Sequence, residues 1–195
     1  NAHTGIKGVK LINEYVNYLT KYIGCNKSEI LVSSTGVIGE IFSPNLIINS
    51  IAKINKKLPG SLMEGARAIM TTDTYPKISV KNVRINKKSF KIYGIAKGSG
   101  MIHPNMGTML VYIFIELEIS NNILDKLLKE NLEKTFNSIS TDGDTSTSDT
   151  LFLFSIKKNK INLKSNKNYK VIKKSLFDVM QDLSLKVVRD GEGIS

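Results

Sequence analysis

One apolar run most constrains how this chain of 195 residues folds. Residues 110–115, Leu-Val-Tyr-Ile-Phe-Ile, carry β-branched and aromatic side chains and no charge, so they are predicted to form a buried strand. The segment 94–108 before it combines several glycines with Lys97, one proline and Thr108. A small residue followed by threonine at the start of a buried strand is typical of an N-terminal nucleophile. Thr108 would cut the Gly107–Thr108 peptide bond, and its freed α-amine, with a pKa of about 7.7 to 8.0, would act as its base.

Hydrophobic periodicity predicts helices and strands on both sides of this run. Helices are expected where apolar residues recur three and four positions apart, at residues 9–23, 45–58, 61–70, 121–136 and 169–188. Further strands are expected at residues 29–32, 78–95 and 150–156, the second folding into a hairpin around Asn86-Lys87-Lys88. Because strands and helices do not alternate in a strict βαβ order, we predict a layered α+β fold, with one domain unit over residues 1–195.

Individual residues mark the ends and faces of these helices. Gly24 is predicted to end the first helix, and Ser61 with Glu64 has the spacing of a capping box that opens the third. Ser120 can cap the fourth. The last helix is expected to bury one apolar face, which is formed by Ile172, Leu176, Val179, Met180, Leu183 and Val187.

Charge and composition limit the class of protein. The formal net charge is +11, and basic surfaces attract nucleic-acid phosphates. The basic residues are nearly all lysines, whereas phosphate and base recognition favours the two-pronged arginine side chain. We therefore favour a solvated lysine-rich surface and expect no nucleic-acid partner. No apolar run approaches the roughly 20 residues of a membrane span, and the single cysteine, Cys25, fits a reducing compartment. We expect no membrane partner and a cytoplasmic location.

Five blocks of the sequence resemble the ornithine acetyltransferase family, the glutamate N-acetyltransferases of arginine biosynthesis. In family order, the blocks are residues 31–39 (with Ser-Ser-Thr-Gly), 66–77 (with Thr-Thr-Asp-Thr), 94–110, 142–150 (with Asp-Gly-Asp-Thr-Ser) and 189–193 (Arg-Asp-Gly-Glu-Gly). The resemblance implies the layered sandwich of sheets and helices that this family shares with the self-processing aminopeptidases. It also implies that the chain is a fragment of a larger enzyme.

The resemblance assigns a role to each matching residue. Thr108 becomes the nucleophile that takes acetyl from N2-acetyl-L-ornithine and passes it to L-glutamate through an acetyl-threonine intermediate. Thr35, through its hydroxyl, and Gly36, through its backbone N–H, become the oxyanion donors. The substrate-binding positions are Thr74, Lys97, Thr108 and Glu192. The family usually has alanine before the cleaved bond, where this chain has Gly107.

Cofactor and partner expectations follow from the same resemblance. We expect no cofactor, with acetyl-CoA as a second candidate acetyl donor, and a heterotetramer of self-cleaved α and β chains. Two histidines, His3 and His103, and one thiol are too few for the usual nitrogen–sulfur zinc site, so no metal is expected. Three alternatives remain open: a self-processing aminopeptidase-like hydrolase with the same nucleophile, an inactive fragment, and a basic binding module.

Overall fold

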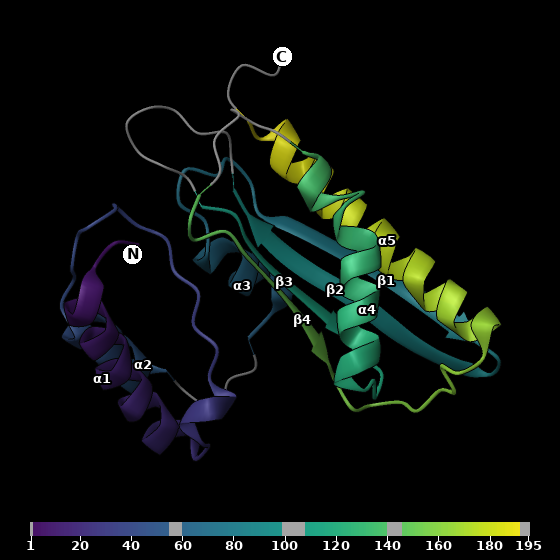
Figure 1. The fold of residues 1–195 in the computed structure, drawn as a ribbon, viewed down its shortest axis with the longest axis horizontal. Coiled ribbons are helices and arrows are strands. Elements are labelled where there is room, and N and C mark those ends of the chain that lie inside the picture. The colour runs from purple at the N-terminus through teal and green to yellow at the C-terminus, as the bar shows by residue number, and fades with distance from the viewer. Residues whose placement is uncertain (1, 55–59, 99–107, 140–145, 192–195) are drawn as a thin grey trace. The chain divides into compact units, whose positions relative to one another are not determined.

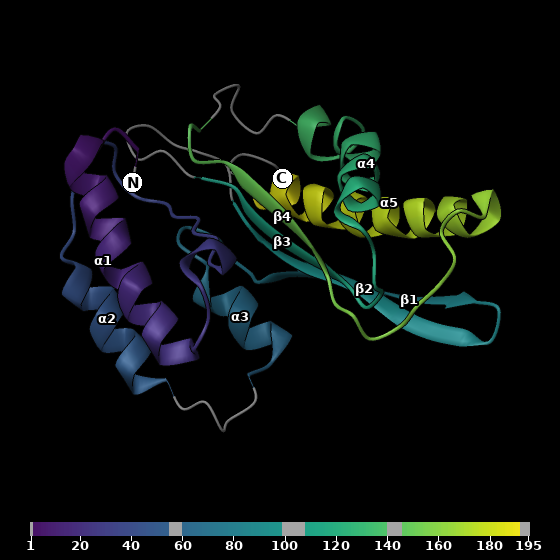
Figure 2. The same cartoon turned by 60° about the horizontal axis from the view of Figure 1, so that its bottom comes forward.

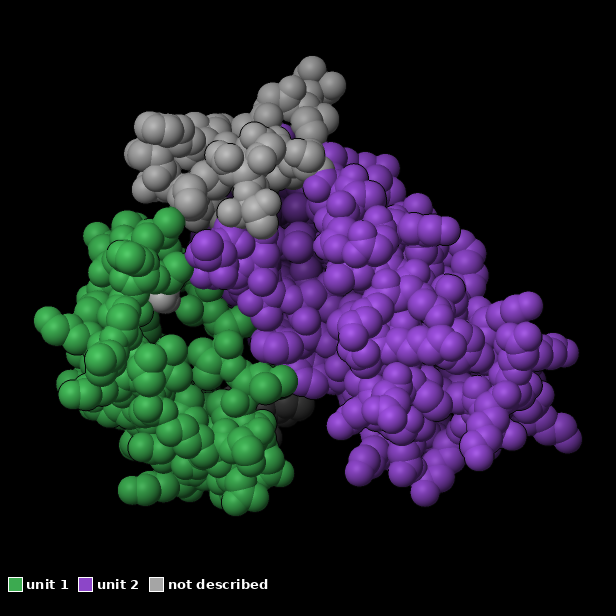
Figure 3. Space-filling view, in the orientation of Figure 1, with its two compact units in different colours: residues 1–60 green, residues 61–195 purple. Residues whose placement is uncertain are grey.

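The computed structural model describes residues 2–54, 60–98, 108–139 and 146–191. The chain forms two compact units, residues 1–60 and residues 61–195, which are coloured separately in Figure 3. The single domain unit expected over the whole chain stays a prediction.

Unit 1 is built on two helices. Helix α1 (Gly5–Ile23) ends at Gly24, which adopts the left-handed conformation with φ of 81° and donates its N–H to Thr20 O at 2.8 Å, as predicted. Helix α2 (Pro44–Lys53) ends five residues before the predicted end at residue 58. The two helices enclose a small core of Leu11, Tyr15 and Val16, with Ile30, Phe42, Ile47 and Ile48 packed around it.

The strand predicted at residues 29–32 is wrong. Residues Lys27–Glu29 form a short 3-10 helix, η1, and residues 30–37 belong to no helix or strand. A capping box, in which the Glu29 carboxylate accepts the Asn26 N–H at 2.7 Å, holds residue 29 in η1. Leu31 and Val32 are exposed, so the apolar residues after it are not buried as a core strand would be.

Unit 2 contains a four-stranded sheet in the order β1-β2-β3-β4 (Figures 1 and 2). Its strands are β1 (Lys77–Ile85), β2 (Lys88–Lys97), β3 (Leu110–Ile115) and β4 (Thr150–Ser155). The first three are antiparallel and β4 is parallel to β3. The predicted hairpin is confirmed, and its turn has Asn86 at φ of 57°, where asparagine replaces the glycine usual in such turns.

Helices cover the sheet of unit 2. Helix α5 (Asn166–Arg189) packs on β1 and β2, and α4 (Asn121–Leu132) packs against α5 (Figure 2). Helix α3 (Leu62–Ala68) also packs on β1 and β2, and it opens with the predicted Ser61–Glu64 capping box. Helix α4 ends before the predicted residue 136, and Phe136–Ser138 forms a separate 3-10 helix, η2. The layered α+β fold predicted from the sequence is thus confirmed.

The core of unit 2 lies between α5 and the sheet. All six residues predicted for the buried face of the last helix are buried there, against Ile92 of β2 and Ile113 of β3 among others. A Cβ atom at Gly94 would lie 2.8 Å from Tyr112 O and 3.1 Å from Leu183 Cδ1. Gly94 therefore permits β2 to approach both β3 and α5 closely.

The directions of the strands in unit 2 determine which strand ends lie next to one another. Lys77 at the start of β1 pairs with Ala96 near the end of β2, and Leu110 at the start of β3 pairs with both Lys97 and Thr150. Four strand ends therefore meet at one end of the sheet.

Of the helices that the structure describes, none has the length and apolar character needed to cross a membrane.

Candidate active site

Three of the expected site residues lie at the end of the sheet where β2 ends and β1, β3 and β4 begin. Thr108 lies two residues before β3, Lys97 is the last residue of β2, and Thr74 lies three residues before β1. Neighbouring antiparallel strands run in opposite directions, so the end of β2 meets the starts of β1 and β3. The fold thereby brings together residues that are up to 34 positions apart in the sequence.

Thr108 is enclosed by the segment that leads into β4. It is 3% exposed, and its Oγ1 lies 3.0 Å from Ser146 Oγ, with either hydroxyl able to donate. The next residue, Met109, donates its N–H to Asp149 Oδ1 at 2.8 Å and accepts the Thr150 N–H at 3.0 Å. Three contacts therefore hold the start of β4 against the candidate nucleophile.

Lys97 is a buried ammonium group beside this segment. It is 1% exposed, and its Nζ donates to Thr71 Oγ1 at 3.3 Å. Burial lowers the pKa of Lys97, and the carboxylates of Asp73 and Asp149 offset part of that shift. A desolvated ammonium gains stability when an anion binds next to it, so Lys97 is suited to hold a substrate carboxylate.

A second buried lysine lies at the centre of a charge cluster. Lys77 makes ion pairs with Asp73, at 2.6 Å, and with Asp190, and all three side chains are at most 1% exposed. Asp73 also accepts the Gly98 N–H at 2.8 Å. Burial raises the pKa of Asp73, but the hydrogen bond from Gly98 and the Lys77 ammonium outweigh burial and lower it overall. The cluster joins the end of α5, the start of β1 and the residue that follows Lys97.

Thr74 belongs to the same cluster. Its N–H donates to Asp190 Oδ2 at 3.1 Å, and its hydroxyl donates to Asp190 Oδ1. Asp190 therefore fixes the orientation of Thr74 and accepts its hydroxyl proton in a hydrogen bond. The substrate-binding role of Thr74 stays a prediction.

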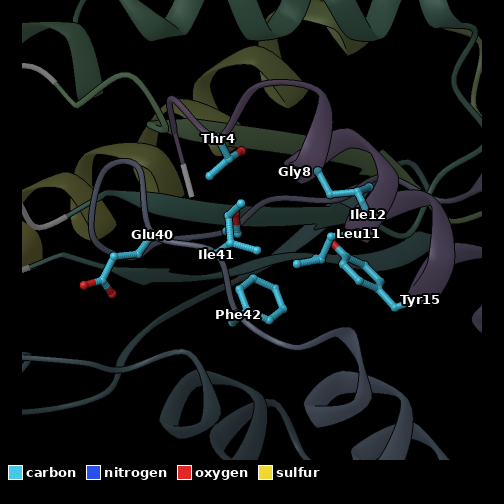
Figure 4. A pocket seen from close by; sticks show the side chains of 9 residues that line it. Thr4, Gly8, Leu11, Ile12, Tyr15, Glu40, Ile41 and Phe42 are labelled. Atoms are coloured by element: carbon cyan, nitrogen blue, oxygen red, sulfur yellow. The ribbon is translucent and has the colours of Figure 1, made fainter.

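The expected oxyanion donors belong to unit 1. Thr35 is half-buried and Gly36 is exposed, in the irregular segment between η1 and α2. Thr108 belongs to unit 2, and the role of Thr35 and Gly36 as its oxyanion donors also stays a prediction. The neighbouring residue Ser34 lines a small pocket within unit 1 (Figure 4). The eight other residues that line it are Thr4, Gly8, Leu11, Ile12, Tyr15, Glu40, Ile41 and Phe42. Gly107 and Glu192 lie outside the described residues.

Comparison with known proteins decides the family. The family model described as "ArgJ family" matches residues 1–195, the whole chain.

The chain belongs to the ArgJ family.

Curated relatives agree with this assignment. The arginine biosynthesis bifunctional protein ArgJ of Bartonella henselae is 41% identical over 199 residues, which cover 99% of this chain and 48% of that protein. The ArgJ proteins of Ruegeria pomeroyi (43% over 194 residues, 99% and 47% covered) and Bradyrhizobium diazoefficiens (40% over 200 residues, 99% and 48% covered) are similar in the same way. The chain thus spans about half the length of the curated ArgJ relatives it matches. The family resemblance drawn from the five blocks is confirmed.

Several residues of this ArgJ-family site were not singled out from the sequence. Ser146 and Asp149 lie in the fourth matching block, and Asp73 and Lys77 in the second. The available signal was the spacing of Asp73 and Lys77, four residues apart with opposite charges, just before an alternating strand. In the described ranges, no group of three or more His, Cys, Asp or Glu side chains is arranged to hold a metal ion.

Proposed function

We propose that this chain acts in arginine biosynthesis as a glutamate N-acetyltransferase with Thr108 as its nucleophile. It moves the acetyl group of N2-acetyl-L-ornithine to L-glutamate. The observation that carries the proposal is a buried threonine at the start of β3, its hydroxyl 3.0 Å from Ser146, in a chain that matches the ArgJ family along its whole length. The relatives, named arginine biosynthesis bifunctional proteins, support the pathway.

Self-processing prepares the nucleophile. Thr108 Oγ1 attacks the Gly107 carbonyl carbon, the peptide C–N bond breaks, and water hydrolyses the resulting ester. The products are an α chain that ends at Gly107 and a β chain that begins with the free α-amine of Thr108. The two chains assemble as a heterotetramer in the cytoplasm.

Acetyl transfer then takes two steps. The Thr108 α-amine accepts the hydroxyl proton while Oγ1 attacks the acetyl carbonyl of acetylornithine, and ornithine leaves with the proton on its nitrogen. The amine of glutamate attacks the acetyl-threonine ester and regenerates the hydroxyl. No cofactor takes part, and acetyl-CoA can serve as a second acetyl donor.

The remaining predicted residues bind and polarise the substrates. The Thr35 hydroxyl and the Gly36 N–H donate to the oxyanion that forms during each attack. Lys97 and Glu192 carry opposite charges and hold opposite ends of an amino-acid substrate, with Thr74 beside them. The low exposure and lowered pKa of Lys97 support this role.

Replacing the Thr108 hydroxyl tests the proposal. In the full-length gene product, Thr108→Val keeps the shape and removes the nucleophile, whereas Thr108→Ser keeps a hydroxyl. Intact mass and N-terminal sequencing should show two chains, the second starting at residue 108, for wild type and Thr108→Ser, and one chain for Thr108→Val. Acetyl transfer should be lost in Thr108→Val. A different cleavage site, or unimpaired transfer in Thr108→Val, would overturn the assignment.

Product analysis separates acyl transfer from hydrolysis by the same nucleophile. Incubation with acetylornithine and glutamate should yield acetylglutamate and ornithine in equal amounts. Release of acetate in place of acetylglutamate would favour the aminopeptidase-like hydrolase.

A further inference from the structure

Ser146 has a side-chain contact that the five blocks did not predict. Its Oγ lies 3.0 Å from Thr108 Oγ1, and it accepts the Ser148 N–H at 3.2 Å. A serine hydroxyl offers one proton and two lone pairs. Because Ser148 occupies one lone pair, the proton and the second lone pair remain for Thr108.

The segment that follows Ser146 is also held by contacts that do not involve the Ser146 side chain. The Met109 N–H donates a hydrogen bond to Asp149 Oδ1 at 2.8 Å, and the Met109 carbonyl accepts the Thr150 N–H at 3.0 Å. Thr150 also pairs with Leu110 in the parallel register of β3 and β4. Removal of the Ser146 hydroxyl should therefore leave the segment in place. The effect of that hydroxyl on Thr108 can then be measured separately from its effect on the fold.

We propose that Ser146 is a positioning residue for the nucleophile, an inference that rests on the proposed function. While Thr108 keeps its proton, Ser146 accepts the Thr108 hydroxyl hydrogen bond and fixes the direction of Oγ1. When Thr108 gives that proton to its α-amine, the Ser146 hydroxyl rotates and donates to Oγ1. Ser146 keeps its own proton throughout, so no further proton acceptor is needed.

The same donation acts when the acetyl-threonine ester breaks down. Oγ1 is then the leaving group and gains negative charge, which a donor already in place stabilises. Ser146 therefore affects both half-reactions and self-processing. Its contact is with the nucleophile and not with Lys97, so turnover should change more than substrate binding.

Three variants of the full-length protein test this role. Ser146→Ala removes the hydroxyl, Ser146→Thr keeps it, and Ser148→Ala is a matched control because the backbone N–H that Ser146 accepts is unchanged. We expect Ser146→Ala to lower kcat and the cleavage rate about tenfold, with KM within about twofold. Ser146→Thr should recover most of the rate, and Ser148→Ala should behave as wild type.

The outcomes separate the inference from the proposed function. Wild-type kcat and cleavage in Ser146→Ala would overturn the role of Ser146 and leave Thr108 as the nucleophile. Equal rate losses in Ser146→Ala and Ser146→Thr, with matching falls in melting temperature, would show a role in folding and overturn it too. A wild-type protein that neither cleaves itself nor transfers acetyl would instead contradict the proposed function, and this inference with it.

Discussion

Two buried lysines lie on neighbouring strands at the same end of the sheet, in contrasting surroundings. Lys77 pairs with Ala96, the residue before Lys97, and the two lysines are 0% and 1% exposed. Lys77 makes ion pairs with the carboxylates of both Asp73 and Asp190. The Nζ of Lys97 donates to the Thr71 hydroxyl at 3.3 Å, and burial lowers its pKa, although the carboxylates of Asp73 and Asp149 offset part of that shift.

The contrast separates two roles of a buried charge, which can stabilise the fold through ion pairs or bind a ligand of opposite charge. Two carboxylates around Lys77 compensate its loss of hydration, and through Asp190 they join α5 to the sheet. Such a cation stabilises its neighbours, because removing it leaves two buried carboxylates without their ion-pair partner. Lys97 has a less favourable environment for its charge, which a substrate carboxylate would improve. Lys77 is therefore a structural residue, and Lys97 is the better candidate for binding.

The largest expected effect is on stability, in Lys77→Met. Loss of the ammonium leaves Asp73 and Asp190 buried without their ion-pair partner, which should reduce the free energy of unfolding by about 3 to 5 kcal/mol. Lys97→Met should cost clearly less, because the apolar side chain also removes a desolvation penalty. Urea unfolding of both variants, followed by circular dichroism, measures the difference.

Lys81→Met is the control for this comparison. Lys81 lies on the same strand as Lys77 but is 47% exposed in its pair with Asp178, so its replacement should change stability little. Equal destabilisation in Lys77→Met and Lys97→Met would show that the two lysines do not differ in the way proposed.

The second effect is on activity, in Lys97→Met. A charge-assisted hydrogen bond to a substrate carboxylate is worth about 1.5 to 3 kcal/mol, so kcat/KM should fall by about 10- to 150-fold. Acetylornithine and glutamate both carry carboxylates, so both half-reactions should lose efficiency. Each half-reaction is measured separately in the full-length protein.

Lys91→Met supplies the matched variant, since Lys91 lies on β2 with Lys97 but is exposed. Its half-reactions should equal those of wild type. A loss of less than about threefold in both half-reactions of Lys97→Met, below what a charge-assisted hydrogen bond supplies, would show that Lys97 does not bind substrate.

The elements of unit 2 followed from local sequence patterns, whereas its charge cluster did not. The alternation in residues 78–95, the uncharged run 110–115 and the apolar face of α5 each predicted an observed element. These signals lie within one strand or helix. Lys77 and Asp190 are 113 residues apart, and no local pattern indicates that such residues meet.

In unit 1, one prediction from a local sequence pattern was wrong. The strand predicted at residues 29–32 rested on a short apolar stretch, but Leu31 and Val32 are exposed there. Thr108 and Lys97 were predicted as site residues because they belong to recognisable blocks at strand ends, and their roles stay predictions. Ser146 lies in such a block too, but its contact with Thr108 depends on the parallel pairing of β3 and β4, which the sequence did not predict.

The smallest expected effect is a change in the alkaline pH dependence, tested with Lys97→Arg. If the protonated form of Lys97 binds the carboxylate, activity falls as pH rises through its pKa. Burial lowers that pKa, so the fall should begin below the ordinary lysine value of about 10.4. Arginine stays protonated to about pH 12 or above, so kcat/KM of Lys97→Arg should fall at higher pH than that of wild type.

The first half-reaction, measured with acetylornithine from about pH 7 to 11, gives this comparison. The δ-amine of acetylornithine titrates equally with both proteins and cancels in their ratio. At pH values below that fall the ratio should be constant, because Lys97 is protonated there. A ratio that stays constant over the whole range would show that the charge of Lys97 does not control binding, whatever Lys97→Met does to the rate.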